Sequence, residues 1–270
     1  MVTDQVPGDV QGVLDRLAGP GASFVTGLVA AAALDRPVII DSASVMAAVW
    51  PYTWLLGRIG PGGIKLTSAG YLPPPVVAEA VSELGWEKDW PGAHNREHYT
   101  LPVLELRRSA RRLGLVRTHR GVLLRTMLGT RLGQDPGQLW WYVASRLPEA
   151  RGDAERDAGL LLLLAVASAT PLDMQGTDEL LRRGMTALGW RDAATKQGLE
   201  QWQAFEAARS TWECLRRLGA IPETQFGEPP SRPAAAGVAL ARAALRGPGF
   251  LQAPDLFAHK SNQCVIQAVF

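Results

Sequence analysis

The chain has little cysteine: its 270 residues include only Cys214 and Cys264. Two thiols cannot build a disulfide framework or a four-cysteine metal site, and so low a content suits a reducing compartment. Cys214 lies in an apolar-periodic stretch and is predicted to be a small buried core residue. These observations favour a cytoplasmic protein.

Long apolar runs are also missing. The longest, GLLLLLAVASA at residues 159–169, is far shorter than the ~20 residues that a membrane-spanning helix needs. It is therefore predicted to be a buried helix, and we expect no membrane partner. Residues 1–12 contain Asp4 and Asp9 and lack the basic and then apolar order of a signal peptide.

Recognisable catalytic and cofactor motifs are absent as well. The glycine-rich residues 60–63 lack the lysine and the serine or threonine of a phosphate loop and are predicted to form a turn. His94 and His98 are four residues apart, but Asn95 stands where the zinc-protease pattern has glutamate, so we expect no metal site. No cofactor is expected, and an enzyme of an unrecognised type stays a minor alternative.

A repeated phrase is the most informative feature that is present. Arginine, an aliphatic residue and glycine end apolar-periodic stretches at residues 58–60, 112–114 and 217–219. After each comes a small residue, two spacers and a glycine, with first members Thr67, Thr126 and Ala234. Glycine stops a helix because it adopts the left-handed conformation easily. Helix, glycine stop, hairpin, turn and helix follow one another in this order in a winged-helix unit.

A longer duplication overlaps this one. Leu84-Gly85-Trp86 recurs as Leu188-Gly189-Trp190, and residues 84–113 and 188–218 each hold a polar loop, a helix and an Arg-Leu-Gly stop. The shared order at a shared separation indicates duplication, whereas the alternative is that Leu-Gly endings are simply common helix stops.

The predicted fold is mainly α with short β-hairpins, as two or three serial winged-helix-like units. A chain of this length exceeds one ordinary core of ~100–200 residues. We expect an N-terminal segment (1–21), a first unit (22–72), a basic second unit (73–150), a third unit (151–249) and a tail (250–270).

The second unit carries the clearest functional signal. Residues 101–113 are predicted to form a helix, and 115–118 and 122–125 to form hairpin strands. One helical face is apolar and the other is rich in arginine at ~100° per residue. In helix-turn-helix proteins the second helix enters the major groove, and guanidinium groups bind phosphate or guanine. The candidate nucleic-acid-binding residues are Arg107, Arg108, Arg111, Arg112, Arg117, His119 and Arg120.

Two functions of different classes therefore stay open. One is binding of double-stranded DNA through helix 101–113 and wing 115–125. The other is a protein-interaction scaffold with no nucleic-acid binding and no catalysis, because a net charge of only +2 gives no global attraction to nucleic acid. In the scaffold the arginines are solvated or pair with acids such as Glu149, Glu155 and Asp157.

Several stretches resemble one family. They are LVAAAALDRPV (28–38), PYTWLLGRIG (51–60), IKLTSAGYLPPPVVAEAVSELG (64–85), NREHYTLPVLELRRSARRLGLV (95–116) and GVALARAALR (237–246). Together they resemble the C-terminal region of actinobacterial proteins grouped with the plasmid ORF-three-like family. That resemblance implies no assigned activity and no catalytic residues. From these residues we expect no counterpart of the domain that usually precedes this region, and Ala234 stands where the family pattern has threonine.

Overall fold

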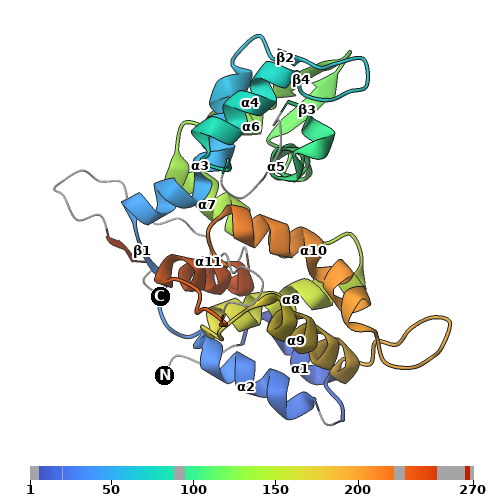
Figure 1. Cartoon of the computed structure of the whole chain (residues 1–270). Coiled ribbons are helices and arrows are strands. Elements are labelled where there is room, and N and C mark those ends of the chain that lie inside the picture. Colours follow the sequence, from blue (N-terminus) through green and yellow to red (C-terminus); the bar gives the residue numbers. More distant parts are fainter. Residues whose placement is uncertain (1–5, 20, 88–94, 222–228, 248–264, 268–270) are drawn as a thin grey trace. The chain divides into compact units, whose positions relative to one another are not determined.

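The computed structural model describes residues 6–19, 21–87, 95–221 and 229–247, and the backbone of 265–267. The chain is mainly helical and contains a small three-stranded antiparallel sheet (Figure 1). It divides into two compact units. Val45–Trp140 is named the sheet unit here, and Met1–Ser44 with Trp141–Phe270 the helical unit.

The sheet unit is a run of helices interrupted by three short strands. Its strand order is β2-β4-β3, with both pairs antiparallel, so the strand before α4 pairs with the last strand of the hairpin. The elements are α3 (Ser42–Ile59, which begins in the helical unit), β2 (Ile64–Lys65), α4 (Pro74–Glu83), the 3-10 helix η1 (Glu97–Tyr99), α5 (Leu101–Arg112), β3 (Val116–His119), β4 (Val122–Arg125), α6 (Met127–Leu132) and α7 (Pro136–Ala144, which ends in the helical unit).

The helix and hairpin predicted between residues 101 and 125 are confirmed. Helix α5 ends at Arg112, and Gly114 terminates it, because its φ of 70° lets the N–H of Leu115 reach the carbonyl oxygen of Ala110 at 2.9 Å. The hairpin turns at Arg120 and Gly121, with φ of 47° and 75°. Two left-handed residues give a two-residue turn that matches the twist of the strands.

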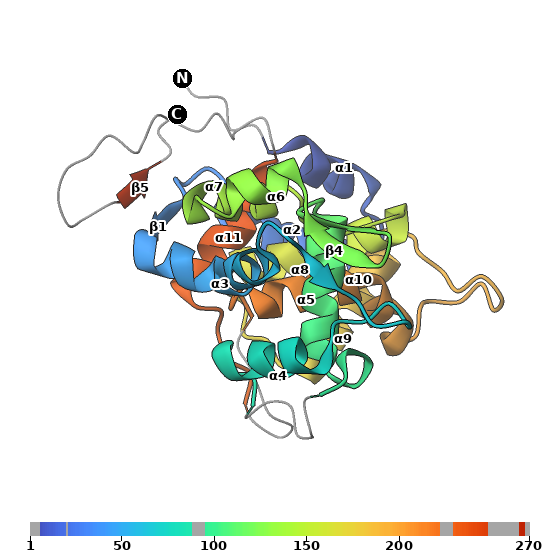
Figure 2. The ribbon, with the colours of Figure 1, turned by 90° about the horizontal axis from the view of Figure 1, so that it is seen from above.

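The helical unit is built around α8 (Asp153–Ala167). This helix contacts α2, α9, α10 and α11, which lie around it in Figure 2. Residues 157–167 are all buried, which confirms the predicted buried helix, and Cys214 on α10 is buried as predicted. The other elements are α1 (Gly8–Arg16), α2 (Ala22–Ala32), β1 (Ile39–Asp41), α9 (Met174–Ala187), α10 (Gln201–Arg217), α11 (Ala235–Arg246) and β5 (Val265–Gln267).

The compact units differ from the segments expected from sequence. The expected boundary between residues 72 and 73 falls inside the sheet unit, because β2 pairs with β4 across it. The expected N-terminal segment is tied to the helical unit, since the guanidinium of Arg16 donates two hydrogen bonds to Asp157, at 2.6 and 2.8 Å. In the expected tail 250–270, β5 pairs antiparallel with β1. The rest of the tail and His94 lie outside the described residues.

The repeated small-x-x-glycine phrase has one structural role in two of its three copies. A Cβ atom on Gly129 would collide with the carbonyl oxygen of Leu115, and one on Gly237 would collide with that of Ala220. Both glycines therefore let the start of a helix pack against the backbone just after an Arg-Leu-Gly stop. Gly70 has open space at its Cβ position and belongs to a turn, so the first copy is different.

Candidate nucleic-acid interface

Helix α5 separates its side chains by face as the period predicts. Val103, Leu106 and Ala110 are buried, with exposed fractions of 0–1%. Arg108, Arg111 and Arg112 are exposed. Residues three and four positions apart share a helical face, so Arg108, Arg111 and Arg112 form one basic strip.

Arg107 lies apart from this strip. Its Nε donates to Oε1 of Glu97, and the exposed fractions of the two side chains are only 12% and 0%. The other carboxylate oxygen of Glu97 accepts the backbone N–H of Leu72 at 2.7 Å. Arg107, a candidate binding residue on sequence, therefore holds the unit together at this point and offers little surface to a ligand.

One acid partly neutralises the basic strip. Glu105 accepts a hydrogen bond from Nη1 of Arg108 at 2.7 Å, and its second oxygen lies 3.9 Å from Nη2 of Arg112. In the described part of the chain no ion pair involves Arg111. On α5 itself, three exposed arginines stand against one glutamate.

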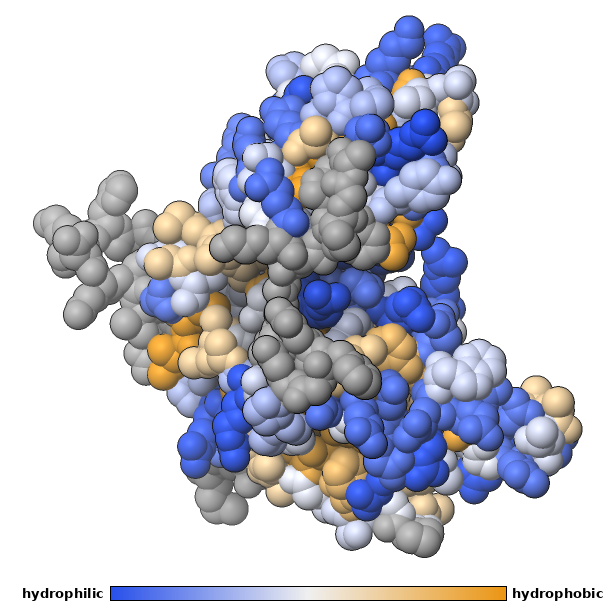
Figure 3. Space-filling view, viewed as in Figure 1, coloured by the Kyte–Doolittle hydropathy of each residue, from blue (hydrophilic) through white to orange (hydrophobic). Residues whose placement is uncertain are grey.

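The hairpin adds basic side chains next to α5. Arg117, His119 and Arg120 are all exposed, as the sequence predicted. The sheet register places Lys65 opposite Val122, and Val122 opposite His119. Cross-strand neighbours share one face of a sheet, so Lys65 joins His119 and Arg117 on the outer face. In Figure 3 hydrophilic residues predominate on the sheet unit, with apolar residues between them.

Lys65 and Glu97 were not identified from the sequence. Lys65 becomes part of the surface only through the register of β2 on β4, and a two-residue strand has no readable period. Glu97 lies beside His98 in a polar stretch that is typical of a solvated loop, yet its exposed fraction is 1%. Thr100 directly precedes α5, but its hydroxyl donates to the carbonyl of Arg96 at 3.0 Å and does not cap the helix.

Two of the three acids that the scaffold interpretation assigned to these arginines, Asp157 and Glu155, have other partners. Asp157 accepts from Arg16 and, at 2.8 Å, from the indole N–H of Trp190. Glu155 accepts the backbone N–H of Arg151 at 2.7 Å. Both sets of bonds lie within the helical unit.

Helix α10 provides an internal comparison with α5. Its Arg209 donates to Glu206 at 2.9 Å on the same helix, and Glu213 adds a second acid. The buried residues of α10 include Ala208, Trp212 and Leu215. The helix thus carries an apolar packing face and a mixed-charge face.

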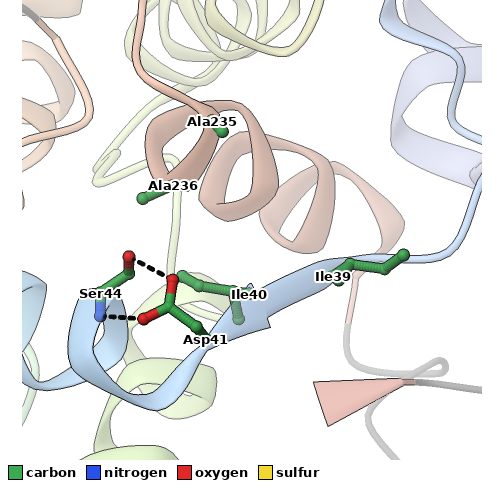
Figure 4. Close-up of a pocket in the computed structure, with 6 residues that line it drawn as sticks. All are labelled: Ile39, Ile40, Asp41, Ser44, Ala235 and Ala236. Atoms are coloured by element: carbon green, nitrogen blue, oxygen red, sulfur yellow. Dashed lines mark hydrogen bonds between the residues drawn. The ribbon is translucent and has the colours of Figure 1, made fainter. Parts of the chain in front are cut away.

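A hollow in the helical unit has polar atoms that already pair with one another. It has a volume of about 240 Å³ and is lined by Ile39, Ile40, Asp41, Ser44, Ala235 and Ala236 (Figure 4). Asp41 accepts the backbone N–H of Ser44 at 2.9 Å and its hydroxyl at 2.6 Å, which lowers the pKa of this carboxyl. These bonds cap the start of α3.

The described residues contain no group of three or more histidine, cysteine, aspartate or glutamate side chains placed to hold a metal ion. In the same part of the chain, each helix is too short or too polar to cross a bilayer. Comparison with protein-family models, curated proteins and solved structures finds no match to this chain.

Proposed function

We propose that the sheet unit is a winged-helix domain that binds double-stranded DNA, with α5 as the recognition helix and the β3–β4 hairpin as the wing. The order helix, strand, helix, helix, hairpin and the strand order β2-β4-β3 support the assignment. The observation that carries the functional proposal is the exposed basic face of α5, followed directly by a basic hairpin.

The size of this surface suits a duplex. Helix α5 has 12 residues, which is about 18 Å at 1.5 Å per residue, and the major groove is ~12 Å wide and admits one helix. In the proposed complex the strip of Arg108, Arg111 and Arg112 faces the groove or its phosphates. Arg117 and Arg120 on the hairpin reach the neighbouring backbone.

We propose further that the helical unit contains a second, reduced winged helix. The sheet unit has the element order α3, β2, α4, α5, β4 and α6. The helical unit follows the same order with α8, the bridge residue Leu172, α9, α10, the bridge residue Ser231 and α11. The matching close approaches of Gly129 and Gly237 support this correspondence. The mixed charge of α10 favours a packing role for this second unit.

The scaffold alternative has one observation in its favour. The sheet unit exposes five large apolar or aromatic side chains, with exposed fractions of 92% for Met127, 65% for Tyr99, 54% for Met46, 47% for Leu101 and 46% for Trp50. Exposed apolar residues that cluster mark protein-binding surfaces. A protein partner on these residues would not need the arginines.

Fluorescence anisotropy with a labelled duplex tests the DNA proposal. We expect binding at low salt that weakens steeply as salt rises, because each neutralised phosphate releases condensed counterions. A mixed-sequence duplex suffices, since phosphate contacts carry no sequence information. If the full chain does not bind the duplex at 50 mM salt, the DNA proposal fails and the scaffold is the better account.

A further inference from the structure

We propose that a cleft in the helical unit binds the phosphate group of a small molecule. The cleft has a volume of about 340 Å³, and its lining includes Gly19, Gly21, Arg182, Arg183, Thr186 and Arg191. This set is named the arginine cleft. It shares no residue with the DNA surface of the sheet unit, and the inference stands independently of that function.

Two backbone segments are held close together to form the cleft. The N–H of Ala18 donates to the carbonyl oxygen of Ala187 at 2.9 Å, which joins the segment before α2 to the end of α9. A Cβ atom on Gly21 would lie 2.8 Å from the Cβ of Ala187 and 3.1 Å from the carbonyl oxygen of Arg183. Only glycine permits this approach, so the geometry of the cleft is built into the sequence.

Two of the three arginines are held in place without an acidic partner. The guanidinium of Arg183 lies 4.5 Å from the ring centroid of Phe24. Nη1 of Arg191 donates to the carbonyls of Thr186 and Trp190, at 3.0 and 2.8 Å. Over the described residues, neither Arg183 nor Arg191 forms an ion pair.

Arg182 contributes less charge to the cleft. It donates two hydrogen bonds to Glu179, at 2.7 and 2.8 Å, and the carboxylate raises its pKa. Glu179 also attracts Arg183 through space without forming an ion pair with it, so the charge of Arg183 is partly compensated and that of Arg191 is the less compensated of the two. A guanidinium has five N–H donors, and the contacts of Arg183 and Arg191 leave most of theirs for a ligand.

The other polar groups at the cleft also suit an anion. Oγ1 of Thr186 is buried and has no hydrogen-bond partner in the described part of the chain. Helix α2 begins at the cleft without a side-chain cap, so its positive end is uncompensated there. The opposing end of α9 is already satisfied, because its carbonyls at Ala187 and Thr186 accept from Ala18 and Arg191.

A phosphate group fits this chemistry better than a neutral ligand. Planar guanidinium groups bind phosphate oxygens in pairs, and a hydroxyl can donate to a third oxygen. The cleft is at the lower end of the ~300–1,000 Å³ range of small-molecule sites. That size suits one or two phosphate groups with a small remainder, such as a diphosphate or a phosphate monoester.

Isothermal titration of the full chain with inorganic pyrophosphate tests the proposal. Arg183→Gln and Arg191→Gln should each weaken binding by at least about tenfold, since a hydrogen bond to a charged group is worth that much. Thr186→Val should weaken it severalfold, because it removes only the hydroxyl. The matched control is Arg209→Gln on α10, outside the cleft, which should change the affinity less than about twofold.

The outcomes are separable. Failure of the wild-type chain to bind pyrophosphate, or equal weakening in all the arginine variants, would overturn the proposal. A labelled DNA duplex forms a second arm. If Arg183→Gln and Arg191→Gln weaken duplex binding while pyrophosphate does not bind, the cleft belongs to a nucleic-acid surface and the small-molecule proposal is wrong. Circular dichroism on each variant verifies that the fold is retained.

Discussion

Arg107 and Glu97 form an ion pair that is almost wholly removed from water, in a stretch whose sequence looks like a solvated loop and a basic helix. Because Glu97 also accepts the backbone N–H of Leu72, one carboxylate joins η1, α5 and the segment that leads into α4. The fold of the sheet unit thus uses one of the arginines that the charge pattern had assigned to DNA.

Arg107→Ala should lower the free energy of unfolding by about 3 kcal/mol, because it leaves the carboxylate of Glu97 buried without its cation. Urea denaturation followed by circular dichroism measures this. The control is Arg108→Ala. The Arg108 side chain is 56% exposed and pairs with Glu105, three residues earlier on the same helix, so its loss should lower the free energy of unfolding by less than about 1 kcal/mol. Equal losses from the two variants would show that the Arg107 pair has no special structural weight.

Gly129→Ala should destabilise the chain by about 2 kcal/mol or more, since the new methyl group collides with the carbonyl oxygen of Leu115. The matched control is Gly57→Ala in the exposed part of α3, where nothing lies within 4 Å of the Cβ position. That change should stabilise by up to about 1 kcal/mol through helix propensity. If the thermal midpoints of both variants shift in the same direction, the close contact of Gly129 with Leu115 does not explain the effect.

Ala234→Thr should stabilise the chain by about 1 kcal/mol. The equivalent residue at the start of α6, Thr126, accepts the N–H of Gly129 at 2.9 Å, whereas α11 has no side-chain cap. Ala234 already has extended backbone, with φ of −63° and ψ of 158°, which suits a capping residue. Ala234→Val adds the same bulk without the hydroxyl, so a thermal midpoint raised equally by both substitutions would rule out capping as the cause.

Much of this architecture is readable from the sequence. Helix α5, the β3–β4 hairpin, the buried α8 and the core position of Cys214 follow from apolar period and glycine placement, which are local signals. The position of Lys65 depends on pairing with β4, which is distant along the chain. The partner of Arg107 is only ten residues away, but Glu97 lies in a polar stretch that gives no local sign of burial. The phrase that ends at Gly70 matches the other two only in residue type, because Gly70 lacks the close backbone contact that Gly129 and Gly237 make.

Asp178→Asn should raise stability at pH 7. Burial raises the pKa of the Asp178 carboxyl, and its Oδ1 has no hydrogen-bond partner in the described part of the chain. Because its pKa is raised, the Asp178 carboxyl binds its proton more tightly in the native state than in the unfolded state, where the pKa is about 3.9. Stability therefore falls as pH rises above about 3.9 and this carboxyl must ionise. Urea midpoints should diverge in favour of the variant between pH 4 and pH 7, and converge at pH 3. A constant gap across this range would contradict the assignment.

The most direct measurement of the DNA proposal is the salt dependence of duplex binding in two double variants. Arg111→Ala with Arg120→Ala removes one exposed cation from α5 and one from the hairpin turn. If both contact phosphate, the slope of log affinity against log salt should become shallower by about 1.8, at ~0.9 per contact. Arg209→Ala with Arg216→Ala on α10 should leave the slope nearly unchanged. Equal changes in both double variants, or no binding by the wild-type chain at low salt, would contradict DNA binding through the sheet unit.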